Sequence, residues 1–251
     1  MALGDSSTYG YGLREAEAWP RLVESRLRER GHLVDVVNGG VIGCTVVQGR
    51  VRFEELAPAT RPRVVLLAFG AVNDHFGAPL GVSDLQRVAA WSSGEDFPTR
   101  LRNESALVQL TAVALGMDDR TEVDLELQKR RESWGALDYA GVRRVALDEF
   151  SSELVALCAA ARAIGAEPMV ISMPRRPDFE ARKPILSSYS VAVERAAADA
   201  GARLVDARGA LASMPPDEVF LVNDRVHPTP AGHMRIAELA TEALSAFLEG
   251  R

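Results

Sequence analysis

The stretch Val64-Val65-Leu66-Leu67-Ala68-Phe69 is a continuous apolar run. Such runs are typical of strands that are buried on both faces of a parallel sheet. A second run of this type is Pro168-Met169-Val170-Ile171-Ser172-Met173, and shorter candidates lie at residues 33–37 and 203–206. A further short strand at the amino terminus would lead directly into Ser6. The sequence therefore predicts several parallel strands.

Helical patterns separate these strands. Residues 14–30 are rich in Glu, Arg, Ala and Leu with apolar residues at helical spacing, and Gly31 follows as a stop. Further helices are expected at residues 145–164, 187–200 and 230–248. This alternation predicts an α/β fold, a three-layer α/β/α sandwich with a mostly parallel, flavodoxin-like central sheet. At 251 residues the chain suits a single domain spanning 1–251.

The composition excludes several classes of protein. There are 35 acidic and 29 basic residues, a formal net charge of −6, so nothing indicates a nucleic-acid partner. The two cysteines, Cys44 and Cys158, suggest neither a disulfide framework nor a zinc site, and we expect no metal. No apolar run reaches the ~18 residues that a membrane span needs.

The amino terminus looks cut, because only three residues precede Gly4 where a strand of about five is expected. No charged-then-apolar leader precedes Gly4 either. The localisation therefore stays open between cytoplasmic and exported. The oligomeric state is open as well.

Four short stretches combine the residue types that cleave an ester. They are Gly4-Asp5-Ser6, Asn38-Gly39-Gly40-Val41-Ile42-Gly43, Asn73-Asp74 and Asp224-Arg225-Val226-His227. The first three each follow an expected strand, and in such sheets ligands bind beyond the carboxyl ends of the strands. We therefore expect the four stretches to meet on one rim.

A serine hydroxyl needs a general base, because it is a poor nucleophile at neutral pH. Of the four histidines, His32 is expected on the opposite rim and His233 inside the last helix. His227 is therefore the best-placed base for Ser6, with His75 in reserve. Asp224 precedes His227 by three residues, a spacing that lets its carboxylate reach the second ring nitrogen.

Three groups could stabilise an oxyanion beside Ser6. They are the backbone N–H of Ser6, the backbone N–H of Gly43, which has no side chain to obstruct approach, and the side-chain amide of Asn73. The alternatives are a plain turn glycine at Gly43 and an Asx-turn at Asn73. Ser7 is an alternative nucleophile. Asp5 is interpreted as a residue that holds the turn.

Taken together, the four stretches resemble the GDSL family of esterases and lipases, also called SGNH hydrolases. The resemblance implies a serine-dependent carboxylic-ester hydrolase that forms an acyl-enzyme on small acyl or carbohydrate esters, without metal or organic cofactor. In the family, the residues matching Gly43 and Asn73 serve the oxyanion hole. Two positions depart from the pattern: Ala71 stands where glycine is usual, which could shift the register by one residue, and Ser7 replaces leucine.

Other functions remain open. The family also contains thioesterases and acyltransferases, and a catalytically inactive domain of this fold could serve as a binding scaffold. A flavodoxin-like module could use residues 4–10 as a phosphate loop. The partner expected for an ester hydrolase is a small-molecule ester. A yellow colour on purification would favour the flavodoxin-like module.

The family resemblance does not cover residues 77–145. We expect a helical insertion there, with a helix opening at Ser83, another at 105–116 and a charged segment at 121–132. It could form a lid or pocket wall, or a decoration packed outside. Arg175 and Arg176 also leave a strand on the expected rim. They would either meet an anionic substrate or remain solvated surface residues.

Overall fold

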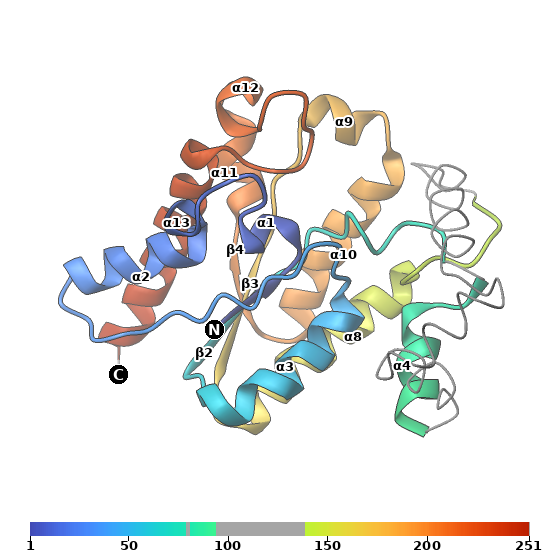
Figure 1. Ribbon diagram of the computed structural model, residues 1–251, viewed down its shortest axis with the longest axis horizontal. Helices are drawn as coiled ribbons and strands as arrows, with labels where there is room; N and C mark the ends of the chain where they lie inside the picture. Colours follow the sequence, from blue (N-terminus) through green and yellow to red (C-terminus); the bar gives the residue numbers. More distant parts are fainter. Residues whose placement is uncertain (79–80, 94–138, 251) are drawn as a thin grey trace, which may run out of the picture.

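The computed structural model describes residues 1–78, 81–93 and 139–250, and its centre is a sheet of four parallel strands (Figure 1). In spatial order these are β1 (Ala2–Gly4), β2 (Val64–Ala68), β3 (Glu167–Ile171) and β4 (Arg203–Val205). The pairing places Leu66 beside Ala2 on one side and beside Met169 on the other. The apolar runs quoted above are thus strands, and the α/β class is confirmed.

Helices cover both faces of this sheet (Figure 1). On one face lie α2 (Trp19–Glu29) and α13 (Pro230–Glu249), which pack against each other. On the other lie α3 (Val46–Thr60), α8 (Leu147–Ala163) and α10 (Pro184–Asp199). The shorter helices are α1 (Ser6–Tyr9), η1 (Glu15–Glu17), α4 (Asp84–Ser93), α9 (Pro177–Ala181), α11 (Ala207–Ala212) and α12 (Pro216–Val219).

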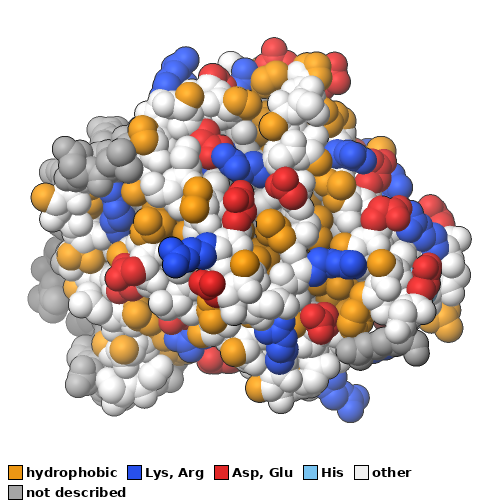
Figure 2. Space-filling view, turned by 180° about the vertical axis from the view of Figure 1, so that it is seen from behind, with side chains coloured by type: hydrophobic (Ala, Val, Ile, Leu, Met, Phe, Trp, Pro, Cys, Tyr) orange, Lys and Arg blue, Asp and Glu red, His pale blue; other side chains and the backbone are white. Residues whose placement is uncertain are grey.

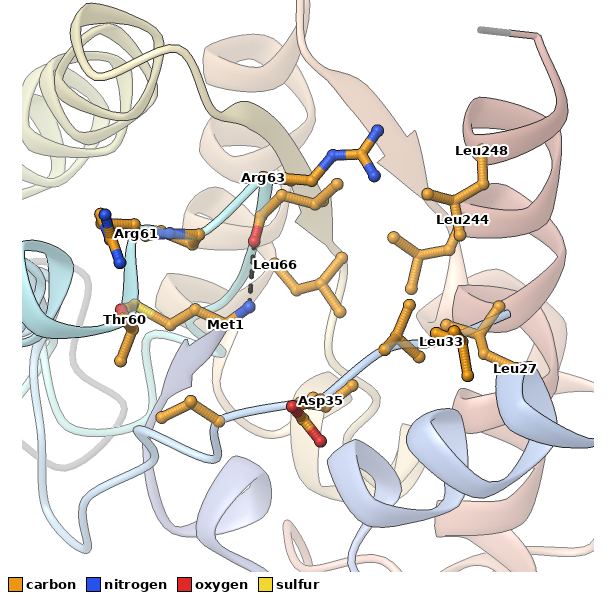
Figure 3. Close-up of a pocket in the computed structure, with 15 residues that line it drawn as sticks. Met1, Leu27, Leu33, Asp35, Thr60, Arg61, Arg63, Leu66, Leu244 and Leu248 are labelled. Carbon is orange, nitrogen blue, oxygen red and sulfur yellow. Dashed lines mark hydrogen bonds between the residues drawn. The ribbon is translucent and has the colours of Figure 1, made fainter. Parts of the chain in front are cut away.

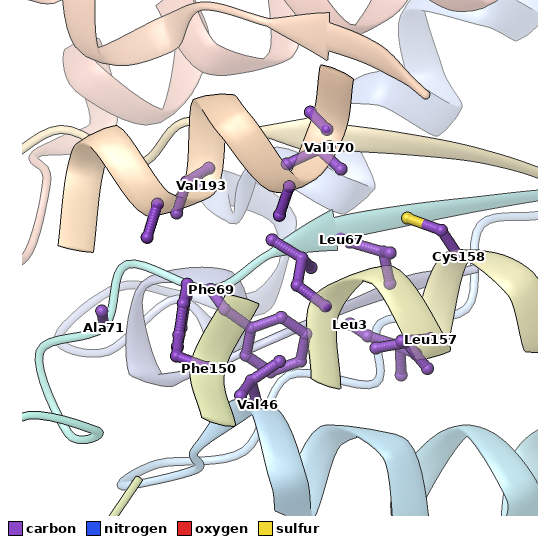
Figure 4. Packing of buried hydrophobic residues seen from close by; sticks show 14 of the residues in the cluster. Leu3, Val46, Leu67, Phe69, Ala71, Phe150, Leu157, Cys158, Val170 and Val193 are labelled. Carbon is purple, nitrogen blue, oxygen red and sulfur yellow. The ribbon is translucent and has the colours of Figure 1, made fainter. Parts of the chain in front are cut away.

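Two hydrophobic cores lie on the two faces of the sheet, because successive strand side chains point in opposite directions. Leu67 belongs to one core with Phe150 of α8 (Figure 4), and Leu66 belongs to the other with Trp19 of α2. Both strand residues are almost fully buried. This double burial explains why the strands read as unbroken apolar runs.

The strand expected at residues 33–37 does not form, and that prediction is wrong. The segment passes beside β1, where the Ala2 N–H donates to the Val37 carbonyl at 2.8 Å, but the pairing amounts to one isolated bridge between Ala2 and Asn38. Side chains of α2 take its backbone groups instead: Glu24 accepts the N–H of Val36 at 2.6 Å, and Arg28 donates to the carbonyl of Val34 at 2.9 Å. These two groups are therefore bound by side chains of α2 and not by another strand.

A cavity lies between this segment and the amino-terminal ends of β1 and β2 (Figure 3). It has a volume of about 290 Å³. Apolar side chains of α2, β2 and α13 line it, including Leu27, Leu66 and Leu244. The Met1 amino group, which donates to the Val64 carbonyl at 3.0 Å, also lies at this cavity. Since this is the amino-terminal end of β1 and β2, the cavity lies away from the residues that follow those strands.

Helix α3 was not among the expected elements, although it begins with a recognisable signal. Thr45 and Gln48 form a capping box, each side chain bonding the backbone N–H of the other. Gly49, one turn into the helix, lies against the Phe69 ring, which a Cβ atom at this position would meet at 2.1 Å. The helix thus packs closely on the residue that follows β2.

The expected helix near Ser83 is present as α4, and Ser83 accepts a hydrogen bond from the N–H of Gln86 at 3.3 Å. The expected helix at 105–116 and the charged segment at 121–132 lie outside the described residues. Across residues 1–78, 81–93 and 139–250, no helix has the length and apolar character that crossing a membrane requires. Acidic and basic side chains are interspersed on the face seen in Figure 2.

Candidate active site

The turn that carries Ser6 is built by its neighbours. Asp5 caps α1, accepting the N–H of Ser7 at 2.9 Å. Burial raises the pKa of Asp5, although that hydrogen bond and the nearby His227 and Arg175 oppose the effect. A Cβ on Gly4 would meet the Thr8 hydroxyl at 2.2 Å, so only glycine allows this close turn. The interpretation of Asp5 as a turn-holding residue agrees with this geometry.

Three side chains from the two ends of the chain are hydrogen-bonded in series. Ser6 Oγ lies 2.8 Å from His227 Nε2, and His227 Nδ1 lies 2.7 Å from Asp224 Oδ2. A carboxylate only accepts hydrogen bonds, so the proton of a neutral His227 belongs on Nδ1. The unprotonated Nε2 then faces the Ser6 hydroxyl, which is the arrangement that a general base requires.

The loop before α13 holds Asp224 in place. Its Oδ1 accepts the N–H groups of Arg225, Val226 and His227 at 2.6, 2.9 and 3.0 Å. Burial opposes ionisation of Asp224, but the hydrogen bonds from Val226 and His227 outweigh it and hold its pKa below the usual value. The carboxylate is therefore charged at neutral pH. The Tyr11 ring lies against the His227 ring, with a centroid separation of 4.5 Å and a tilt of 35°.

The loop of Gly43 lies beside the Ser6 turn. Val41 N–H donates to the Gly4 carbonyl at 3.1 Å. Gly43 has φ +78°, and a Cβ there would meet nothing within 4 Å. Among the described residues, the N–H groups of Ser6 and Gly43 have no protein acceptor. Backbone donors are rarely left without a partner, so both are available to a ligand or water.

Asn73 joins this loop from the end of β2. It is 8% exposed, and its Nδ2 donates to the Cys44 carbonyl at 3.2 Å. An amide nitrogen carries two protons, so this bond orients the group and leaves a second donor. The neighbouring Asp74 accepts the N–H of Val46 at 2.9 Å, and burial raises its pKa to about 7. Asp74 thus anchors the start of α3.

The alternative bases and nucleophile lie elsewhere. His75 is buried with Nδ1 3.2 Å from the Ala71 carbonyl, and burial lowers its pKa to about 3. His233 accepts the N–H of Trp19 at 3.0 Å inside the α2–α13 packing. The Ser7 hydroxyl donates to the Val226 carbonyl at 3.4 Å. The hydrogen-bond partner of the Ser6 hydroxyl is His227, as predicted from the sequence.

The expectation that Arg175 remains a solvated surface residue is wrong. This side chain is buried and donates to the Gly70 and Leu186 carbonyls. It thereby ties Gly70, two residues after β2, to α10. Arg176 is on the surface, paired with Asp178 at 3.1 Å and Asp217 at 2.8 Å.

Sequence reasoning missed three further residues near this site. Tyr11 stacks on His227, and Arg144 and Asp84 form a buried pair beside Gly43. Their contacts join residues that are far apart in the sequence, so no local motif predicts them. Within the described ranges, no cluster of three His, Cys, Asp or Glu side chains could hold a metal ion.

An α/β fold with a parallel sheet and a Ser–His–Asp arrangement at the ends of its strands defines an acyl-hydrolase type of protein. The chain belongs to the GDSL-like lipase/acylhydrolase family, whose pattern it matches over residues 2–235. The resemblance seen in the four sequence stretches is thereby confirmed.

Individual relatives agree with this family. An arylesterase from Vibrio mimicus is 35% identical over 79 residues, which are 32% of this chain and 40% of the relative. Esterase TesA from Pseudomonas aeruginosa is 27% identical over 115 residues, 46% of this chain and 54% of the relative. The matches thus span about half or less of each relative's length.

Solved structures extend the similarity to the whole fold. The lipase/acylhydrolase from Enterococcus faecalis superposes with a TM-score of 0.62 at 17% identity, covering 98% of this chain and 94% of the other. At this identity the likeness concerns the fold alone. The three-layer architecture expected from the sequence is confirmed at that level.

Proposed function

We propose that this protein is a serine-dependent carboxylic-ester hydrolase that works through an acyl-enzyme. The observation that supports this most is the hydrogen-bonded series of Ser6, His227 and Asp224, with contacts of 2.8 and 2.7 Å. The Asp224 carboxylate fixes the tautomer of His227, and the unprotonated Nε2 of His227 then faces the Ser6 hydroxyl as a general base.

In the acylation step, Ser6 Oγ attacks the ester carbonyl carbon while His227 Nε2 takes the hydroxyl proton. The carbonyl π electrons move to the oxygen and form a tetrahedral oxyanion. When the oxyanion collapses, the carbon–oxygen bond to the alcohol breaks, and His227 returns the proton to that alcohol. Water then repeats the sequence on the acyl-serine and releases the acid.

The oxyanion is proposed to bind the N–H groups of Ser6 and Gly43 and the free proton of the Asn73 amide. Two observations support this: neither backbone N–H has a protein acceptor among the described residues, and Asn73 is held against the Gly43 loop through Cys44. Each donor of this type contributes on the order of 3 kcal/mol to lowering the barrier.

Small esters with an apolar alcohol are the proposed substrates. Tyr11, Val41 and Ile42 are 46%, 41% and 55% exposed, and they flank His227 and Gly43. Such side chains favour an apolar group beside the reacting carbonyl. One of the relatives, the Vibrio mimicus protein, is named an arylesterase, which points to the same type of leaving group. Carbohydrate esters, thioesters and acyl transfer are the competing specificities.

Hydrolysis of p-nitrophenyl acetate by the wild type, Ser6→Ala and Ser7→Ala tests the proposal. We expect Ser6→Ala to abolish turnover and Ser7→Ala to retain most of it, because the Ser7 hydroxyl bonds a backbone carbonyl. A serine-reactive phosphonate should label Ser6, as read by peptide mass spectrometry. Labelling at Ser7, or equal activity of wild type and Ser6→Ala, would refute the assignment.

A further inference from the structure

A buried ion pair joins the two ends of segment 77–145. Arg144 Nη2 lies 2.9 Å from Asp84 Oδ2, and the two side chains are only 9% and 4% exposed. The backbone binds the same residues together, since the Asp84 N–H donates to the Arg144 carbonyl at 2.7 Å. The Arg144 N–H donates to the Phe76 carbonyl, also at 2.7 Å. The guanidinium is therefore held in a fixed place.

Both members of this ion pair contact the Gly43 loop. Arg144 Nη1 donates to the Gly43 carbonyl at 3.1 Å, and the Thr45 hydroxyl donates to Asp84 Oδ2 at 2.9 Å. Arg144 Nη2 also donates to the Gln48 side chain at 3.2 Å, in the first turn of α3. A guanidinium is suited to this task, because its fork presents several donors in one plane.

The Gly43 loop has little internal support. Within residues 41–45 one backbone hydrogen bond forms, from Cys44 N–H to the Val41 carbonyl at 3.1 Å. Gly43 itself lies at φ +78°, where a glycine moves easily. External groups hold the loop instead, among them Asn73 on the Cys44 carbonyl, Arg144 on the Gly43 carbonyl and Asp84 on the Thr45 hydroxyl.

We propose that Arg144, held by Asp84, is a positioning residue that fixes the conformation of Gly43 so that its N–H points at the developing oxyanion. The inference rests on the proposed esterase function. In this proposal segment 77–145 contributes to turnover through Asp84 and Arg144, near its two ends, and this contribution is separate from any role as a lid. Displacing a donor by about 1 Å can cost on the order of 10²-fold in rate.

The experiment compares Arg144→Met and Arg144→Lys with a matched control, Arg50→Met. Arg50 also pairs with an acidic residue, Glu153 at 2.7 Å, and links α3 to α8 without touching the Gly43 loop. The double variant Asp84→Asn/Arg144→Met removes both buried charges, so that neither is left alone if a single variant folds poorly. All rates on p-nitrophenyl acetate are expressed per active site titrated with a phosphonate.

We expect Arg144→Met to lower kcat by about 10- to 100-fold with little change in KM, because the oxyanion bond strengthens only as charge develops. Arg144→Lys should recover part of this loss, and the double variant should resemble Arg144→Met. Arg50→Met should lower the melting temperature while kcat stays near that of the wild type. A normal kcat in Arg144→Met, a rise in KM alone, or an equal loss in Arg50→Met would overturn the inference.

Hydrogen–deuterium exchange of the peptide that contains residues 41–45 provides a readout that needs no activity. Faster exchange in Arg144→Met than in Arg50→Met is expected, and unchanged exchange would overturn the positioning role. A wild-type protein that hydrolyses no ester would sink the proposed function. In that case, faster exchange in Arg144→Met would still support the hold of Arg144 on the loop.

Discussion

Replacing Asp224 by asparagine should inactivate the enzyme through the tautomer of His227. Asp224 Oδ1 accepts three backbone N–H groups, from residues 225 to 227, whereas Oδ2 faces His227 Nδ1. Asparagine has a single side-chain oxygen. The three backbone donors hold that oxygen in the place of Oδ1, so the amide NH₂ is left facing the imidazole.

An amide N–H at that position donates to His227 Nδ1 and moves the ring proton to Nε2. That proton then faces the Ser6 hydroxyl across the present 2.8 Å contact, and the ring can no longer accept the serine proton. In a serine triad this change costs about 10⁴-fold in kcat. The loss corresponds to about 5 kcal/mol of barrier.

Asp224→Ala provides the comparison. It removes the carboxylate but introduces no donor, so part of the His227 population keeps Nε2 free. We therefore expect Asp224→Ala to retain more activity than Asp224→Asn. The assay is kcat on p-nitrophenyl acetate at neutral pH, with folding checked by circular dichroism. An asparagine variant within about tenfold of the wild type, or one faster than the alanine variant, would refute the tautomer argument.

Three other predictions concern residues around the site. Asn73→Ala should lower kcat by roughly 10²- to 10³-fold with little change in KM; a loss of thermal stability at an unchanged rate per titrated site would show that the amide only organises the turn. Burial lowers the pKa of His75 to about 3 and that of His233 to about 4. In the unfolded chain both histidines bind a proton near pH 6.5, whereas in the folded protein they stay neutral to a lower pH. The free energy of unfolding is therefore highest above pH 6.5 and falls on acidification towards pH 4, by up to about 1.4 kcal/mol per pH unit for each histidine. Urea unfolding at several pH values should show a smaller loss in His75→Gln than in the wild type, and equal slopes would contradict the assignment. Ala71→Gly should leave the free energy of unfolding within about 1 kcal/mol, since relief of about 1 kcal/mol of strain is offset by a lost methyl and a freer unfolded chain; a large change in urea unfolding, or in kcat, would be inconsistent with that balance.

The sequence predicted the central strands because their burial on both faces leaves a direct mark. Leu66 and Leu67 point into different cores, so both must be apolar. Residues 33–37 have similar side chains, but a strand also needs a partner for its backbone. The sheet provides one isolated bridge near this segment, and the side chains of Glu24 and Arg28 bind the Val36 N–H and the Val34 carbonyl. These long-range contacts leave no strand-breaking signal in the sequence.

Helix α3 is not predicted from the sequence because its composition is unfavourable for a helix. It contains Gly49 and Pro58, both of which lower intrinsic helix propensity. The structure needs Gly49 because the Phe69 ring occupies the space of its side chain. Tertiary packing therefore determines a residue choice that local propensity reads as unfavourable.

In the candidate site, contacts within one loop follow from the sequence, whereas contacts between distant residues do not. Asp224 and His227 were predictable, because an i, i+3 spacing in one loop brings the two side chains together almost independently of the rest of the fold. Arg144 and Gly43 are about a hundred residues apart, and their contact depends on the backbone hydrogen bond that holds Arg144 beside Phe76, after β2. The sequence holds the residues of such a contact but not their proximity.

Ala71 shows how the third sequence stretch tolerates its departure from the family pattern. The alanine itself takes the left-handed conformation, φ +56°, whereas the adjacent Gly70 is not among the glycines with positive φ. A left-handed alanine costs roughly 1–2 kcal/mol. The bonds that follow it offset this cost: Asn73 holds the Cys44 carbonyl, and Asp74 holds the first turn of α3. What this stretch requires is a backbone conformation, which glycine adopts most easily and which the surrounding contacts impose on alanine.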